Sequence, residues 1–433
     1  MSKLSTQPYK GSRDFFPKDM TVRNYIFNTW KKVCESYGYE EYDGPFIEPF
    51  ELYAEKTGEE IVNEQLYSFE DRGNRKVAIR PEMTPTLARM IASKHKILPK
   101  PIKWFSIPNL WRYEKPQRGR LREHFQLNVD IFGVDGIEAD YEVISLATDI
   151  MNEFGATNNM YEIKIGNRRL IDDVLNSYDF SNVEKYTTGK ALDKRSKISE
   201  EEFENLLIKK ANLHKAKIDK LNNFLKNPLP TVEDLVKKGS LGANEVLDLL
   251  KLFRDSEKES LVTYDSTIMR GFDYYTGNVF EQFDKSPENN RSMYGGGRYD
   301  DLLKLFGNEV LTGIGFGMGD VTLKNFLEDW NLLPAFKSNT EVLVTVWPSE
   351  NKKFFKTSSE LAKALRNLGY ATELWLFNNS KLDKQLKYAD KKTIRNVVII
   401  GEEELNSNTV TIKDMSTGTQ KNVSIEDLPE HIS

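Results

Sequence analysis

The chain has 433 residues, enough for two or three domains that each bury a core of their own. Its formal net charge of -5 means that any nucleic-acid contact must come from local basic patches and not from bulk charge. No apolar run is long enough to span a membrane, residues 1–7 lack an apolar signal region, and the single cysteine, Cys34, excludes an intrachain disulfide framework. With only four histidines, composition predicts a cytoplasmic enzyme or adaptor without a His/Cys zinc site or a membrane anchor.

The first clear elements lie between residues 67 and 95. Residues 67–79 read as two strands around a turn at 71–74, and a helix follows. Thr84 is the expected N-cap of that helix and Pro85 its first helical residue. Glu82 would then sit in a bend just before the helix. Its carboxylate either points into a cleft or simply favours the positive end of the helix.

Residues 124–131 alternate strictly between apolar and polar side chains, as a β-strand with two different faces does. The polar face carries His124, Gln126, Asn128 and Asp130. A buried strand of a protein this long has little reason to spend four polar side chains on solvent. We therefore expect this face to line a ligand pocket.

We expect the strand at 124–131 to pair with the segment that carries Arg112 and Glu114. The two would form an antiparallel hairpin. The turn between them, residues 115–122, holds four positive charges. The alternative is an ordinary amphipathic hairpin with a solvated loop.

Residues 176–258 are rich in Lys, Glu, Asn and Leu and predict a helical insertion in a β-rich domain. A capping box is expected from Ser199 to Glu202, and a similar helix start from Thr231 to Asp234. The lysines of this segment are either a solvated helical surface or contacts to a nucleic-acid backbone.

The strand pattern returns at 270–281, 294–300 and 313–319. Alternate glycines in the last of these predict a close approach to the backbone by a helix or a flat ligand. The glycine runs at 295–297 and 313–319 match neither a P-loop nor a dinucleotide-binding fingerprint. Asp320 is the expected N-cap of the helix that follows.

A linker is expected near residues 334–338, followed by a compact α/β unit. Its predicted strands and helices alternate, in the order 342–346 (strand), 359–368 (helix), 373–376 (strand), 382–389 (helix) and 396–400 (strand). The whole chain is therefore of the α+β class.

With these motifs in place, the chain resembles histidyl-tRNA synthetase along nearly its whole length. The segment from Gly38 to Pro45 is similar to motif 1 of class II synthetases, and Arg112 with Glu114 is similar to motif 2. Residues 270–275 and 296–300 resemble the two histidine-specific peptides of the family.

The resemblance implies a class II antiparallel sheet flanked by helices and a C-terminal anticodon-binding domain. The implied boundaries are a catalytic domain at 1–330, interrupted by a helical insertion at 176–258, a linker at 331–340 and the anticodon-binding α/β domain at 341–433.

The implied activity is that of a histidine–tRNA ligase acting on ATP, L-histidine and tRNA(His), with Mg²⁺ bound to the phosphates, in a homodimer. Catalysis rests on positioning and charge stabilisation, for which guanidinium groups are well suited. The resemblance puts Arg112 and Arg270 on the α-phosphate and Glu114 on the adenine amino group. It implies histidine contacts by Glu82, Met83, Thr84, Gln126, Asp130, Tyr274, Tyr275 and Tyr299. It implies contacts to the tRNA acceptor end by Gln117, Arg118, Arg120 and Arg122.

Two positions depart from the family pattern. Thr322 stands where motif 3 has an arginine that holds ATP, and Asp130 stands where the family usually has glutamate. Three replacements for the missing arginine are open: magnesium, the start of the helix after Asp320, and an arginine such as Arg118 or Arg298. Because Asp320 is acidic and would oppose phosphate at that helix end, we expect magnesium and a relocated arginine. The alternative is a non-catalytic relative, such as the regulatory subunit of ATP phosphoribosyltransferase or a tRNA-sensing protein.

Overall fold

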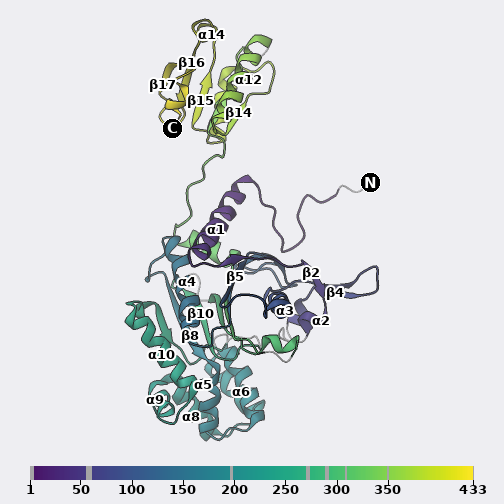
Figure 1. Cartoon of the computed structure of the whole chain (residues 1–433), viewed down its shortest axis with the longest axis vertical. Coiled ribbons are helices and arrows are strands. Elements are labelled where there is room, and N and C mark those ends of the chain that lie inside the picture. Colours follow the sequence, from purple (N-terminus) through teal and green to yellow (C-terminus); the bar gives the residue numbers. More distant parts are fainter. Residues whose placement is uncertain are drawn as a thin grey trace. The chain divides into compact units, whose positions relative to one another are not determined.

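The computed structural model describes residues 4–54, 61–195, 198–269, 274–287, 292–307, 310–348 and 351–432. The chain divides into two compact units, one ending at Leu333 and the other beginning at Pro334. The predicted linker contains this division. Each unit has hydrophobic clusters of its own, and Figure 1 shows the elements of both.

The first unit is built on a mostly antiparallel sheet in which, within the described residues, nine strands pair. The order is β1-β5-β7-β12-β11-β10-β8-β9, and β6 pairs with β7 off this path. The strands are β1 (Glu40–Glu41), β5 (Ile102–Ser106), β6 (Asn109–Trp111), β7 (Glu123–Phe132), β8 (Tyr161–Asn167), β9 (Val262–Tyr264), β10 (Asn278–Asp284), β11 (Ser292–Arg298) and β12 (Gly313–Gly319).

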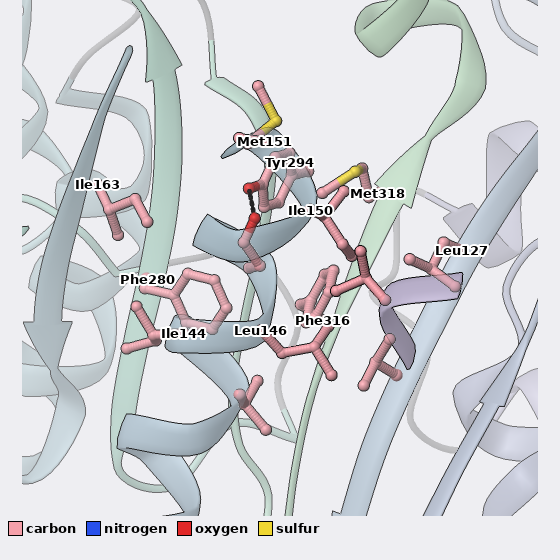
Figure 2. Packing of buried hydrophobic residues seen from close by; sticks show 14 of the residues in the cluster. Leu127, Ile144, Leu146, Ile150, Met151, Ile163, Phe280, Tyr294, Phe316 and Met318 are labelled. Atoms are coloured by element: carbon pink, nitrogen blue, oxygen red, sulfur yellow. Dashed lines mark hydrogen bonds between the residues drawn. The ribbon is translucent and has the colours of Figure 1, made fainter. Parts of the chain in front are cut away.

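The apolar face of this sheet packs against long helices. Figure 2 shows Ile144, Leu146 and Ile150 of helix α4 against Phe280 of β10 and Phe316 of β12. The helices that contribute to this core are α1 (Pro17–Ser36), α4 (Glu138–Glu153), α10 (Leu241–Asp255) and α11 (Asp320–Asp329). The apolar side chains of β7 belong to the same core, so its polar side chains face away from it.

A smaller sheet with the order β2-β4-β3 lies in the same unit and confirms the two strands expected within 67–79. Helix α3 starts at Thr84 with Met83 as the N-cap residue, so the prediction that Thr84 caps the helix was wrong by one position. Proline fits either of the first two helical positions, and Pro85 occupies the second. The elements here are β2 (Ile47–Pro49), α2 (Glu51–Ala54), η1 (Ile61–Gln65), β3 (Ser68–Glu70), β4 (Lys76–Ile79) and α3 (Thr84–Lys94).

The helical insertion has its own hydrophobic cluster, and its helices gather together in Figure 1. The capping box at Ser199 is confirmed, with Glu202 N donating to Ser199 Oγ at 3.2 Å. The helix start at Thr231 was wrong, because Pro228 and Pro230 set the backbone so that the helix already begins at Leu229. The helical insertion starts earlier than the predicted residue 176, because α5 begins at Arg168 and its apolar side chains belong to this cluster. The helices are α5 (Arg168–Ser177), α6 (Asn182–Lys194), α7 (Glu200–Lys209), α8 (Lys215–Lys226), α9 (Leu229–Lys237) and α10. The short helices η3 (Glu259–Leu261) and η4 (Leu302–Leu305) follow the insertion.

The second unit has a sheet of order β14-β13-β15-β16-β17, in which β14, β13 and β15 are parallel and the last two strands are antiparallel. The three predicted strands and two predicted helices are confirmed, although the first helix begins earlier, after Asn351 as its cap. The elements are β13 (Val342–Val344), α12 (Lys352–Asn367), β14 (Thr372–Leu374), α13 (Leu382–Lys391), β15 (Asn396–Ile399), α14 (Glu402–Ser407), β16 (Thr409–Asp414), β17 (Gln420–Ser424) and η5 (Leu428–His431). Of the described helices, none is long and apolar enough to cross a membrane.

Candidate active site

A small polar pocket opens on the face of the large sheet opposite the helical core. The structure brings together there most of the residues expected to contact histidine, together with Arg112. The described residues that line it are Glu82, Thr84, Arg112, Gln126, Asn128, Asp130, Tyr274, Tyr275, Gly295, Tyr299, Gly315, Phe316 and Gly317. Gln126, Asn128 and Asp130 of the polar face of β7 thus line a pocket, as the alternation predicted, whereas His124 is not among the described lining residues.

The alternate glycines of β12 make room for the polar side chains of β7. A Cβ atom added at Gly315 would lie 2.2 Å from Oδ1 of Asp130, and one at Gly317 would lie 1.8 Å from Nε2 of Gln126. Both distances are far too short for non-bonded atoms. The close approach expected from the glycine pattern is therefore made by side chains of the neighbouring strand, and not by a helix.

Asp130 is the deepest carboxylate of the pocket, with 3% of its surface exposed. It accepts a hydrogen bond from the hydroxyl of Tyr299, which is itself buried. Desolvation raises the pKa of the Asp130 carboxyl to about 7 despite this bond. The carboxyl therefore changes its charge near neutral pH while the pocket is empty.

Three tyrosines from two segments form one wall. Tyr274 and Tyr275 have ring centroids 4.8 Å apart, and the Tyr299 ring lies 5.8 Å from the first and 6.5 Å from the second. The hydroxyl of Tyr274 donates to Oε2 of Glu82 at 3.3 Å. The wall therefore offers hydroxyl groups and ring faces between the two carboxylates, Glu82 and Asp130.

Glu82 and Thr84 line the pocket at the start of α3, as expected from their place before the helix. Met83 between them is fully buried, and the described pocket wall does not include it. Its sulfur lies 3.9 Å from Nη1 of Arg80. The expected contact between Met83 and histidine thus stays a prediction, and the structure gives this side chain a place beneath the pocket.

Arg112 follows β6 and is held by its neighbours. Its Nε donates to the carbonyl of Pro81 at 2.9 Å, and its backbone N–H donates to the carbonyl of Arg122 at 2.9 Å. Arg112 lines the pocket together with Glu82. Arg270, the second expected catalytic arginine, lies outside the described residues.

The cationic hairpin forms as predicted, with β6 antiparallel to β7, but its charges have different surroundings. Arg118 pairs with Asp329 at 2.5 Å, and Arg120 lies 3.8 Å from Glu114; both arginine side chains are 55% exposed. Gln117 forms a two-residue bridge with Arg120 at the tip. Glu114 is largely buried beside Arg120 and is not part of the described pocket wall.

Arg122 differs from its neighbours because it is buried. Its guanidinium lies 3.9 Å from the centre of the Tyr113 ring and donates to the Tyr9 hydroxyl at 2.8 Å and to the Glu114 carbonyl at 3.2 Å. These contacts fasten the N-terminal segment to the hairpin. A role in reading tRNA stays a prediction for this residue.

The prediction that Asp320 caps its own helix was wrong. Gly319 is the N-cap residue, and Asp320 accepts instead from the backbone N–H of Phe125 at 2.9 Å and from Arg13 at 2.8 Å. The carboxylate thus continues the pairing of β7 beyond the end of β12, and Arg13 balances its charge. Sequence gave no sign of Arg13, because 307 residues separate the two partners.

Thr322 is part of α11 and donates to the carbonyls of Met293 at 3.0 Å and Gly319 at 3.2 Å. Arg298, one of the expected replacements for the missing arginine, is 3% exposed and bonded to Asp140, Val134 and Gly136. Its guanidinium already has these partners, and Arg298 is not among the described residues that line the pocket, so its role as a replacement stays a prediction.

The chain matches two known protein families. A family model described as histidyl-tRNA synthetase matches residues 11–321, and one described as an anticodon-binding domain matches residues 341–433. The chain belongs to the histidyl-tRNA synthetase family. It is therefore an aminoacyl-tRNA ligase in which both the catalytic and the anticodon-binding domains are present.

Similar proteins cover the chain almost completely. A histidine–tRNA ligase of Leptospira biflexa is 48% identical over 96% of this chain and 95% of its own length. A histidine–tRNA ligase of Haloarcula marismortui is 39% identical over 97% of this chain and 96% of its own length. The crystal structure of histidyl-tRNA synthetase from Nostoc sp. PCC 7120 has a TM-score of 0.83 at 24% identity, with 99% of each chain covered, and confirms the fold. A structure from Bacillus halodurans described as an ATP phosphoribosyltransferase regulatory subunit/histidyl-tRNA synthetase has a TM-score of 0.74 at 23% identity, over 92% of this chain and 99% of its own.

Proposed function

We propose that this protein joins L-histidine to tRNA(His), first activating histidine with ATP to histidyl-adenylate and then passing it to the 3′ end of the tRNA. The observation that carries the proposal is the pocket that holds Glu82, Arg112 and Asp130. The carboxylates of Glu82 and Asp130 are complementary to the ammonium and imidazole groups of histidine, and the guanidinium of Arg112 is complementary to the α-phosphate of ATP.

Glu82, with Thr84 and Gln126, would bind the α-amino group. Asp130 would accept the imidazole N–H, and the tyrosine hydroxyls would satisfy the other ring nitrogen, because a neutral imidazole has one donor and one acceptor. Support comes from the hydrogen bond between Tyr299 and Asp130 and from the placement of Gln126 and Asp130 on one strand face. The adjacent Gly315 leaves room for the Asp130 carboxylate, because a Cβ atom there would lie 2.2 Å from its Oδ1.

ATP would bind with its α-phosphate at Arg112 and Arg270 and its adenine near Glu114. The two guanidinium groups would stabilise the charge that develops when the histidine carboxylate attacks phosphorus. Mg²⁺ would neutralise the outer phosphates when bound. Among the described residues, no group of three or more His, Cys, Asp or Glu side chains is arranged to hold a metal ion.

Transfer RNA would meet both units. At the acceptor end, Gln117, Arg118 and Arg120 lie at the exposed hairpin tip. In the second unit, Trp347 and Phe377 are exposed by 42% and 63%, and Lys384 Nζ lies 5.7 Å from the Phe377 ring. Exposed aromatic rings beside lysines are typical of surfaces that stack unpaired bases.

The active form would be a cytoplasmic homodimer. Ile47 of β2 and Phe69 of β3 are exposed by 46% and 45% on the small sheet, and Phe46 beside them by 40%. A second copy of the chain would cover these apolar side chains. Sedimentation of the purified protein tests this assignment, and a monomer at micromolar concentration would contradict it.

The alternative, a regulatory protein without catalysis, is disfavoured by the complete anticodon-binding domain and by the retained Arg112. The test is charging of a tRNA(His) transcript with labelled histidine. The wild type is expected to charge the transcript, and Arg270→Ala to lose at least about 100-fold in rate because one preorganised donor is gone. Near-normal charging by Arg270→Ala would remove this arginine from the mechanism, and no charging by the wild type would favour the regulator.

A further inference from the structure

A closed ring of polar side chains joins the helical insertion to the strands that carry the pocket. Asn167 ends β8, and its Oδ1 accepts from the N–H of Leu170 in α5 at 2.9 Å. Its Nδ2 donates to Glu245 of α10 and to Asn278 of β10, both at 2.8 Å. Asn278 donates in turn to Asp140 of α4 at 3.1 Å.

Two arginines close the ring. Arg298, at the end of β11, donates through Nε to Asp140 at 3.1 Å, and its Nη1 lies 3.8 Å from Oδ1 of Asp300. Arg169, in the first turn of α5, donates to Oδ2 of Asp300 at 2.5 Å and also to Glu245. Asp300 is thus the place where the two guanidinium groups meet.

The centre of the ring is buried, so its members depend on one another. Asp140 and Asn167 are fully buried, and Asn278 and Arg298 are exposed by only 2% and 3%. A buried charge or amide that loses its partner is costly, so the loss of one member strains the rest. A Cβ atom at Gly277 would lie 3.2 Å from Arg298 Cδ and 3.4 Å from Arg169 Nη1, so the bare glycine backbone lets the two arginines approach.

The ring holds the backbone on both sides of the tyrosine wall. Tyr299 lies between Arg298 and Asp300, and its hydroxyl reaches Asp130 in the pocket. Thr276, the residue after Tyr275, donates through Oγ1 to Asp300 at 2.9 Å and through its N–H to the Arg298 carbonyl at 2.8 Å. A shift of Asp300 would therefore move Tyr299.

The insertion is attached rigidly at this place. A Cβ atom at Gly242 of α10 would lie 2.3 Å from the backbone nitrogen of Leu170, so α10 rests directly on the first turn of α5. Arg169 and Glu245 therefore come from two helices that cannot separate without losing this contact.

We infer that Arg169 is a positioning residue for histidine recognition, and that the insertion fixes the Tyr299–Asp130 pair through the Arg169–Asp300 ion pair. The inference rests on the proposed histidine pocket, and it gives the insertion a role in amino-acid selection. Arg169 is 32% exposed and is not among the described residues that line the pocket, so it acts on histidine recognition through Asp300.

The test uses histidine-dependent ATP–pyrophosphate exchange by the full-length Arg169→Gln variant, with each substrate varied in turn. We expect the KM for histidine to rise about tenfold, with the KM for ATP changed less than about twofold. If Arg169→Gln does not fold, the same measurement is made on Arg169→Lys. Lysine keeps the charge but lacks the forked guanidinium that binds two carboxylates.

Lys217→Gln is the matched control. It removes an ion pair of similar exposure within the same insertion, Lys217 to Glu184 at 2.9 Å, that does not belong to the ring. Equal increases in both KM values, or the same histidine effect in Lys217→Gln, would overturn the inference.

Two further variants separate the inference from the proposed function. Adding Arg169→Gln to Asp300→Asn should cause little further loss, because both changes break one interaction. If Asp130→Asn raises the histidine KM and Arg169→Gln does not, the positioning role fails and the pocket stands. If neither variant changes it, both fail.

Discussion

In the proposed function, histidine selection depends most directly on Asp130, because it is a buried acceptor in the pocket lining. Asp130→Asn keeps the shape but replaces an acceptor oxygen by a donor. We expect the KM for histidine to rise about 100-fold, the scale of a lost charged hydrogen bond, with a much smaller change for ATP. Steady-state exchange kinetics measure both constants, and equal changes would mark Asp130 as structural.

Because of the same carboxyl group, we expect the KM for histidine to depend on pH. Its pKa is raised to about 7, so it becomes protonated below that pH and can no longer accept from imidazole as a carboxylate. The KM for histidine should therefore rise as the pH falls below about 7, and Asp130→Asn should lose most of this rise. Since the folded pKa lies above the unfolded value, this group lowers the stability of the empty protein as the pH rises from about 4 to about 7. A flat profile in the wild type would contradict the assignment.

At the residue scale, the sequence predicted the features that follow from the alternation of side chains along a strand. The polar face of β7 was visible because neighbours along a strand alternate. The contact of Arg13 with Asp320 and that of Arg169 with Asp300 were not visible, because 307 and 131 residues separate the partners. Nothing in local spacing predicts such a pair.

At the scale of elements, the glycines of β12 adapt one strand to the side chains of the next. Gly317→Ala would push the Gln126 amide aside, because the added Cβ would lie 1.8 Å from its Nε2. The three nearest atoms all belong to the flexible side chain of Gln126, so the fold should survive. We expect a several-fold higher KM for histidine with a nearly unchanged melting temperature.

Gly189→Ala in α6 is the control for that variant, because an added Cβ there meets no described atom within 4 Å. It should leave the histidine KM unchanged. A large loss of stability in Gly317→Ala would show that the glycine serves packing and not the pocket.

We expect the arginines of the hairpin to differ in their roles. Arg118→Ala and Arg120→Ala should spare pyrophosphate exchange and each lower the salt slope of tRNA binding by about one, because both side chains are 55% exposed. Arg122→Ala should instead lower the melting temperature, since it removes contacts to Tyr9 and Tyr113. Filter binding at several salt concentrations and thermal melting measure these effects. An unchanged salt slope in both exposed variants would exclude the tip from the tRNA contact.

Element types were easier to predict than element ends. The strand and helix order of the second unit follows from its periodicity, whereas α12 begins at Lys352 because Asn351 caps it, seven residues before its predicted start. The strands β16 and β17 were missed, because Thr409–Asp414 and Gln420–Ser424 are polar on the exposed side and short.

At the scale of the molecule, each of the two units has its own core, so they should separate functionally. A chain cut after Leu333 should keep histidine-dependent exchange and lose most transfer to tRNA, because the anticodon-type unit is gone. Charging assays on both forms measure this. Normal charging by the shortened chain would show that the second unit does not contribute to tRNA recognition.

The central claim is that this pocket activates histidine. The most direct measurement is ATP–pyrophosphate exchange by the full-length wild-type protein, with each of the twenty amino acids supplied in turn. We expect the rate of exchange with histidine to be at least about 1,000-fold above that with the other amino acids, because buried polar groups left unpaired by a wrong side chain discriminate strongly. No exchange with histidine at any ATP concentration, together with restored exchange in Thr322→Arg, would contradict it and identify the natural chain as a binding protein.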